Sequence, residues 1–308
     1  MNDRPTDQRY PTPAVFVKQT PRSVVARATL ALAGLARAEV GFYRDLAPEV
    51  PVDVPTCYHA SFDARHLSFL LVLEDLAASG ADFGRLGDAL DRRRAESVVV
   101  ALADLHARYW SDPRLDGGWP WLRPLVDGFE AGAGQAVAPA LVRRGLRLAG
   151  AAVPSELRPP MLRFARRRTA ITRGLDRGPR TLLHNDCHPG NLAFGDGGHV
   201  WLVDWQLVRA GPWARDLAYF CATALDAHNR AEWERELLEQ YLDRLRSNGV
   251  AAPSFDDAWH EYRCHLVYAL EAMVVTLALG VMQPEARVRP VVARAAAAVA
   301  AHDAFTLL

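Results

Sequence analysis

Short apolar runs near the start of the chain give way to long stretches with helical spacing. The segments Ala14–Val17, Cys57–Phe62 and Leu67–Leu73 are rich in β-branched and apolar residues, and each predicts a strand. Between the first two, Arg22–Leu46 has the spacing of a helix, and it carries Glu39. The first quarter of the chain therefore predicts a small sheet with one helix.

From residue 92 onward, helices dominate the pattern. A compact β segment, Thr181–Trp205, interrupts them, and the run Arg166–Arg168 is typical of a solvated helix face. We therefore predict an α+β protein of two lobes, a β-rich lobe at residues 1–76 and a helical lobe at residues 77–308. The predicted helices are Ala95–Trp110, Pro139–Ala151, Ser155–Arg173, Ala214–Ala227, Ala231–Arg246, Phe255–Leu279 and Arg287–Ala301.

Charge and cysteine content narrow the choice of partner. The chain has 36 basic and 36 acidic residues, so its net charge gives no electrostatic basis for binding nucleic acid or an anionic membrane. The 4 cysteines are scattered without a CxxC pair, and we expect reduced, mostly buried thiols. A small molecule is the expected partner, and the oligomeric state is not predicted.

The hydropathy pattern predicts a cytoplasmic protein. The N-terminal sequence MNDRPTDQRYPTP is polar and lacks the apolar core of a signal peptide. The most apolar stretch, Ala272–Met282, is shorter than a bilayer-spanning helix, so we expect a core helix there.

Lysine is almost absent from the chain. Lys18, at the end of the first predicted strand, is the one lysine, and every other basic residue apart from histidine is arginine. A lysine retained against such a bias indicates a position that needs a compact ammonium rather than a planar guanidinium. A lone lysine left by chance is the alternative.

Residues 184–206, HNDCHPGNLAFGDGGHVWLVDWQ, hold most of the groups with chemical potential. Asp186 lies in a tight loop after the strand Thr181–Leu183, Asn191 closes that loop, and Asp204 ends the strand that returns after the GDGG turn. A hairpin of this size places Asn191 beside Asp204, where two oxygen donors can hold one Mg²⁺. Phosphoryl transfer from a nucleotide to a hydroxyl needs such a cation and an acceptor for the hydroxyl proton, here Asp186.

The same segment resembles a known enzyme family. HNDCHPGN matches the HxDxxxxN catalytic loop of aminoglycoside phosphotransferases and choline kinases, and Asp204-Trp205-Gln206 resembles their metal-binding Asp motif. The resemblance implies a protein-kinase-like bilobal fold with ATP and Mg²⁺ as cofactors. It further implies that Asp186 is the catalytic base and that Asn191 and Asp204 are the metal ligands.

Three nearby residues are expected to support this site. His184 resembles the structural histidine of the family's catalytic loop, and for His188 we expect a structural role near the phosphates. Asp216, within ARDLAYF, resembles the helix-borne aspartate that steadies the loop backbone.

Residues upstream fall in the order of the family. Lys18 resembles the strand lysine that contacts the nucleotide phosphates, and Glu39 resembles its partner on the following helix. LLVLEDL resembles the hinge strand, whose backbone at Glu74, Asp75 and Leu76 would hydrogen-bond adenine. The stretch EVGFYRDLAPEVPVDVPTCYHA is most similar to the ecdysteroid-kinase-like (CHK) branch.

One feature of the family has no counterpart here. Its members carry two strands and a glycine-containing loop before the lysine strand, whereas Met1–Pro13 has three prolines and no glycine. We expect a start codon upstream of Met1, or a fragment, or loss of part of the nucleotide site.

Two other functions stay open from the sequence. A metal hydrolase could use His184, Asp186 and His188, but no further histidine or carboxylate follows at ligand spacing. A pseudokinase, a nucleotide-binding module without turnover, would explain the missing loop but not the presence of Asp186, Asn191 and Asp204 together. We expect ATP-dependent phosphorylation of a hydroxyl on a small organic molecule, whose identity the fold does not fix.

Overall fold

A three-stranded antiparallel sheet forms the first part of the protein. Its strands are β1 (Val15–Gln19), β2 (Cys57–Asp63) and β3 (Ser68–Glu74), in the order β1-β3-β2. The three predicted strands are confirmed, although β1 continues one residue past Lys18, which lies opposite Leu71 of the central strand. The computed structural model describes residues 14–21, 34–125, 129–280 and 283–308.

One helix packs against this sheet and also contacts the large lobe. It comprises α2 (Leu35–Gly41) and a π-type turn, η1 (Phe42–Leu46). The predicted helix is confirmed over these residues, and its residues 22–33 lie outside the described part of the chain. The ring of Phe42 stacks on Trp205 with centroids 3.8 Å apart. This stack joins the helix to the residue that follows Asp204.

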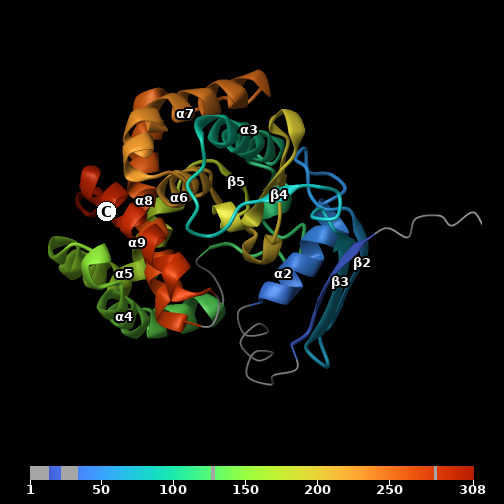
Figure 1. Ribbon diagram of the computed structural model, residues 1–308, viewed down its shortest axis with the longest axis horizontal. Coiled ribbons are helices and arrows are strands. Elements are labelled where there is room, and N and C mark those ends of the chain that lie inside the picture. Colours follow the sequence, from blue (N-terminus) through green and yellow to red (C-terminus); the bar gives the residue numbers. More distant parts are fainter. Residues whose placement is uncertain (1–13, 22–33, 126–128, 281–282) are drawn as a thin grey trace, which may run out of the picture.

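Helices build the larger lobe, and Figure 1 shows α4, α5, α8 and α9 at the far end of the molecule from β2 and β3. Every predicted helix is present in the described residues, and α8 has the predicted bounds. The helices are α3 (Arg92–Arg108), α4 (Phe129–Ala149), α5 (Arg158–Leu175), α6 (Ala214–Ala224), α7 (Ala227–Ser247), α8 (Phe255–Leu279) and α9 (Glu285–Ala301).

Some predictions within these helices are wrong in detail. Helix α4 contains Pro139 in its interior rather than beginning there, although proline usually marks a first turn. Helix α5 begins at Arg158, after a short 3₁₀ turn. In the run Arg166–Arg168 the first two side chains are exposed as predicted, but Arg168 is not part of a solvated face. Its side chain is only 24% exposed, because it bonds to Glu271 of α8 at 2.6 Å.

Two short β sheets surround residues 184–206, the segment that contains Asp186, Asn191 and Asp204. β5 (Arg180–Leu183) pairs with β8 (Arg209–Pro212), and β6 (Leu192–Phe194) lies between β4 (Asp82–Phe83) and β7 (Val200–Leu202). The GDGG turn joins β6 to β7 as predicted, with Gly197 and Gly198 at φ of 72° and 93°, where an L side chain would be strained. Strand β4 has no sequence signature, because two residues show no periodicity.

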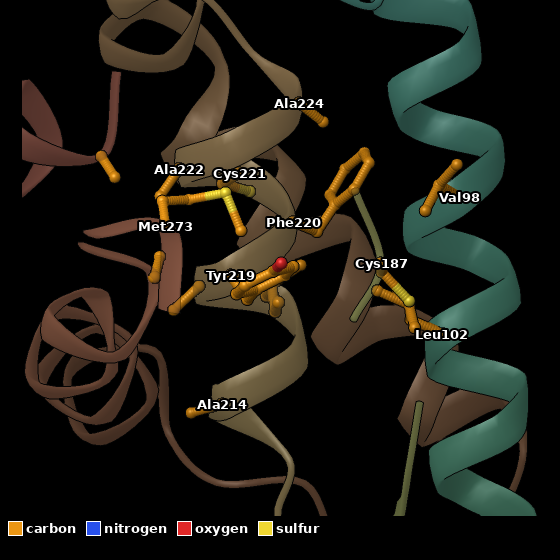
Figure 2. Packing of buried hydrophobic residues seen from close by; sticks show 14 of the residues in the cluster. Val98, Leu102, Cys187, Ala214, Tyr219, Phe220, Cys221, Ala222, Ala224 and Met273 are labelled. Carbon is orange, nitrogen blue, oxygen red and sulfur yellow. The ribbon is translucent and has the colours of Figure 1, made fainter. Parts of the chain in front are cut away.

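Helix α6 is the buried centre of the large lobe. All 11 of its residues are buried. Figure 2 shows Phe220 of α6 turned toward Val98 of α3, with Met273 of α8 on the opposite side. Since α6 also carries Asp216 and Tyr219, this packing holds both polar side chains in place. The four cysteines are free and three are buried, as predicted.

Helix α8 contains most of the apolar stretch singled out in the sequence. Among the described helices it is the one that length and composition would allow to cross a membrane, and 72% of its apolar window is buried inside the protein. Residues 272–279 of this stretch form the end of a helix of 25 residues, which as a whole is longer than the apolar stretch considered alone. The expectation of a core helix is confirmed.

Candidate active site

The loop between β5 and β6 is held by a single carboxylate from α6. Asp216 accepts the backbone N–H of His184 on one oxygen and that of Asn185 on the other, both at 2.7 Å. Asn185 has a left-handed backbone (φ 67°), a conformation that asparagine tolerates better than most residues. Two charge-assisted bonds to consecutive amides therefore fix the entry to Asp186.

Asp186 is half-buried in this loop, with its side chain 14% exposed, and it accepts hydrogen bonds through both carboxylate oxygens. Tyr219 donates its hydroxyl to Oδ1 at 2.6 Å, and the side-chain amide of Asn191 donates to Oδ2 at 3.0 Å. Burial raises the pKa of Asp186, although His188 and the Tyr219 bond act in the opposite direction. A carboxylate with a raised pKa and a fixed orientation is suited to take a proton.

The two histidines of the loop have different surroundings. His184 is fully buried, and its Nε2 lies 3.0 Å from the carbonyl oxygen of Val203. Burial lowers the pKa of His184, which favours a neutral ring that joins the loop to the strand before Asp204. His188 lies with Nε2 3.8 Å from Asp186 Oδ1, and its buried Nδ1 contacts no protein partner among the described residues.

Asn191 and Asp204 lie at the open end of the β6–β7 hairpin, where Asn191 precedes β6 and Asp204 follows β7. The N–H of Val203, the neighbour of Asp204, bonds to the carbonyl of Asn191 at 3.0 Å. Asp204 itself has a left-handed backbone (φ 63°), which turns the chain toward the buried Trp205. A non-glycine residue keeps such a strained backbone only where the surrounding contacts hold it in place, and such residues are often found at functional sites.

The side-chain oxygens of Asn191 and Asp204 fit a hard divalent cation. The side-chain nitrogen of Asn191 donates to Asp186. The side-chain oxygen of Asn191 is therefore available as a metal ligand beside the carboxylate of Asp204. A positive group already contacts Asp204, since Lys18 Nζ lies 2.8 Å from Oδ1. Oxygen donors of this kind suit Mg²⁺, which keeps several waters. No group of three or more His, Cys, Asp or Glu side chains forms a metal site within the described ranges.

Lys18 bonds to one carboxylate in each lobe, and its contact with Asp204 joins the small lobe to the large one. Its ammonium lies 2.8 Å from Glu39 Oε2 and 2.8 Å from Asp204 Oδ1. Burial disfavours the charge of Lys18, but Glu39 and Asp204 outweigh burial and raise its pKa. Burial raises the pKa of Glu39 to about 7, against the effect of the Lys18 charge. The contact between Lys18 and Glu39 is the one that the resemblance implies.

Two cavities meet at Asn191 and Asp204. The first, of about 280 Å³, lies between the lobes, and the second, of about 240 Å³, opens beside Asp186. Asn191 and Asp204 line both. Of the other predicted residues, Lys18, Glu39, Glu74, Asp75 and Leu76 line the first cavity and Asp186 and His188 line the second, whereas His184 and Asp216 line neither.

The segment predicted to contact adenine offers its backbone rather than its side chains. The carboxylate of Glu74 bonds to Thr56 at 2.9 Å, and Asp75 accepts the N–H of Ala77 at 3.1 Å. The N–H of Asp75 bonds to Ala14 at 3.2 Å. Within the described part of the chain, the N–H of Leu76 has no protein acceptor, so it is the donor left for a ligand in the first cavity.

Three contributing side chains are missed by the sequence reasoning. Tyr219 bonds to Asp186, and Tyr268 and Arg215 bond to the backbone and side-chain oxygens of Asn185 at 2.9 and 2.7 Å. One available clue is that Tyr219 follows Asp216 by three residues and so shares its helix face. Arg215 directly precedes Asp216 in the same helix, whereas Tyr268 comes from α8 and carries no local signature.

Comparison with known proteins gives a consistent family and fold. Residues 9–259 match the model of the phosphotransferase enzyme family (APH). No curated protein sequence matches the chain. The GDP complex of wild-type aminoglycoside 2'-phosphotransferase-IIIa is similar in structure, with 11% identity, coverage of 94% of this chain and 86% of that chain, and a TM-score of 0.53. Choline kinase LicA from Streptococcus pneumoniae gives 15% identity, 94% and 87% coverage, and a TM-score of 0.51.

These likenesses show the fold. It is an α+β protein-kinase-like fold, with a small N-terminal sheet followed by a large helical lobe, as the sequence predicted.

Proposed function

The chain belongs to the phosphotransferase enzyme family, and from this premise we propose that it transfers the γ-phosphoryl group of ATP to a hydroxyl of a small organic molecule. The observation that carries the proposal is the meeting of two cavities at Asn191 and Asp204, with Lys18 on one side and Asp186 on the other. One cavity would hold the nucleotide and the other the acceptor. In-line transfer between them requires that arrangement.

The first cavity would bind the nucleotide. Adenine would accept the N–H of Leu76, and the ammonium of Lys18, steadied by Glu39, would contact the phosphates. Asn191 and Asp204 would hold Mg²⁺, which would offset the negative charge that develops on the transferred group. GTP is a reasonable second donor to test, because a similar structure contains GDP.

The second cavity would bind the acceptor with its hydroxyl at Asp186. The two bonds from Tyr219 and Asn191 hold the carboxylate, and a raised pKa favours acceptance of the hydroxyl proton. His184 and Asp216 would support the loop, and His188 would lie near the transferred phosphoryl group. The stretch from Glu39 to Ala60 is most similar to the ecdysteroid-kinase-like branch, and we propose that subfamily on sequence alone.

Two substitutions test the site. Asp186→Asn should bind Mg²⁺ and ATP with little change and lose transfer by a factor of about 10²–10⁴, because the general base is gone. Asp204→Ala should lose the enhancement of ATP affinity that Mg²⁺ gives. Asp196→Asn, an exposed change in the GDGG turn of the same segment, is the matched control and should behave as the unmodified protein.

The measurements are calorimetric titrations with ATP and Mg²⁺, separately and together, and transfer of labelled γ-phosphate to a panel of alcohols and to water. Near-normal transfer by Asp186→Asn would overturn the assignment of the base. Tight binding of Mg²⁺ and ATP without transfer to any acceptor would instead support a nucleotide-binding module.

A further inference from the structure

A third cavity continues the acceptor side of the site. It has a volume of about 390 Å³ and shares the lining residues Leu207, Tyr268, Ala272 and Thr276 with the cavity beside Asp186. A molecule whose hydroxyl reaches Asp186 would therefore extend its remaining atoms into this space.

One side of the third cavity is apolar. Helices α4 and α8 supply Val137, Leu141, Val275 and Leu279 to its lining. Val137 and Leu279 are 51% and 39% exposed, which is unusual for large aliphatic side chains on facing helices. An apolar portion of a ligand would remove this surface from water, at about 25 cal/mol per Å² of area covered.

The charged groups of the third cavity are predominantly positive. Among its described lining residues are four arginines and one carboxylate, and two of the arginines, Arg123 and Arg209, have interaction partners of their own. The charged lining residues are Arg123, Arg168, Arg209, Arg215 and Glu271.

Two of these arginines lie beside the one carboxylate of the described lining. Arg168 contacts Glu271 through Nε at 2.6 Å, while Arg215 donates Nε to Asn185 and lies 3.3 Å above the ring of Tyr268. Burial and the charge of Arg215 lower the pKa of the nearby His265 to about 3. One carboxylate thus faces two guanidinium groups, and positive charge remains in excess.

We propose that the acceptor carries an acidic group, such as a carboxylate, on an apolar body, and that Arg168 recognises this group while the hydroxyl lies at Asp186. The proposal rests on the proposed function, since it names the molecule that the phosphotransferase would phosphorylate. A guanidinium with a planar set of donors suits a carboxylate, and an excess of positive charge disfavours a cationic acceptor. Glu271, the one carboxylate in the described lining, already bonds to Arg168, and Arg215 adds a second guanidinium beside this pair, so the lining is a poor partner for an ammonium group.

Three matched acceptors test the charge preference. They are a medium-chain ω-hydroxy fatty acid, the diol of the same length and an ω-hydroxyalkyl trimethylammonium of the same length. Affinity is measured by calorimetry in the presence of Mg²⁺ and a non-hydrolysable ATP analogue. We expect the acid to bind at least about tenfold more tightly than the diol, and the ammonium compound to bind most weakly. Equal affinity for acid and diol, or no detectable binding of the acid, overturns the proposal.

Variants on both sides of the ion pair sharpen the test. Arg168→Gln should reduce the advantage of the acid over the diol by about tenfold, whereas Glu271→Gln should increase it, because it removes a competing carboxylate. Arg167→Gln is the control, since this exposed neighbour on α5 lies outside the third cavity. An acid preference that none of the three variants changes overturns the role of Arg168.

The nucleotide separates the two proposals. If the protein does not bind Mg²⁺ and ATP, the proposed function fails. If it binds them normally but prefers the diol or the ammonium compound, the phosphotransferase function stands and the acidic acceptor is wrong.

Discussion

Replacement of Tyr219 by phenylalanine isolates one hydrogen bond to the group that would take the proton. The hydroxyl of Tyr219 donates to Asp186 Oδ1 at 2.6 Å; the Tyr219 side chain is buried, and that of Asp186 is half-buried. Burial raises the pKa of Tyr219 well above its usual value, so the hydroxyl keeps its proton and remains a donor. Tyr219→Phe removes the donor and keeps the ring that packs beside Tyr268.

The size of the effect follows from the charge of the acceptor. A hydrogen bond to an ionised group contributes about 1.5–3 kcal/mol, and 1.36 kcal/mol corresponds to roughly one pH unit. The bond stabilises the ionised form of Asp186, so its loss raises the pKa of that carboxylate. The proposed base acts when ionised, and the acidic limb of the pH profile should therefore move upward.

The assay is the pH dependence of kcat/KM for phosphoryl transfer, to water or to an identified acceptor. Well below the limb, the variant should be about 10–100-fold slower, and on the alkaline plateau it should approach the unmodified protein. Tyr262→Phe is the matched control, because Tyr262 also donates a buried hydroxyl to a carboxylate, that of Glu234, at 2.9 Å.

Both variants should lose stability, since each removes one hydrogen bond to a carboxylate. Only Tyr219→Phe should move the acidic limb. An unchanged limb in Tyr219→Phe, or an equal displacement in Tyr262→Phe, would refute the role of this bond in setting the pKa of Asp186.

Two further predictions concern the small lobe. Lys18→Arg keeps the charge but loses the compact ammonium that contacts Glu39 and Asp204 at 2.8 Å each. The Kd for ATP with Mg²⁺, measured by calorimetry, should therefore rise about tenfold. An unchanged Kd would contradict the need for lysine. Gly41→Ala should lower the free energy of unfolding in urea by about 1–3 kcal/mol, because the new methyl group would lie 2.3 Å from the ring of Trp121. Gly174→Ala, where a Cβ meets nothing within 4 Å, is its control and should be neutral or stabilising.

The sequence predicts well what is local along the chain. Asp186, Asn191 and Asp204 lie within one loop and one hairpin, so turn chemistry and strand length alone bring the last two together. Most helices were also predictable, because an amphipathic period over four or five turns is a strong pattern. The ends of the helices were less predictable. Pro139 lies inside α4, which shows that packing can override the preference of proline for the first turn of a helix.

Contacts between distant segments could not be predicted in the same way. The bond from Tyr219 to Asp186 spans 33 residues, and the bond from Arg168 to Glu271 spans 103. Arg168 stands in a run of three arginines, which predicts a solvated helix face, and only its contact with Glu271 of α8 shows otherwise. The resemblance to a family supplied Lys18 as a candidate, but only the fold brings its ammonium against Asp204, 186 residues away.

The contact between Lys18 and Asp204 has a consequence for how the affinities of Mg²⁺ and ATP depend on each other. Lys18 already lies 2.8 Å from Asp204, so a divalent cation on the same carboxylate would be close to a fixed ammonium. At a separation of about 4 Å and an effective dielectric of about 20, the repulsion would be about 8 kcal/mol. Phosphate oxygens placed between the two cations would offset it, because each cation then gains an anionic partner. Mg²⁺ alone should therefore bind weakly, and Mg²⁺ and ATP should each increase the affinity of the other by the same factor, as linkage requires.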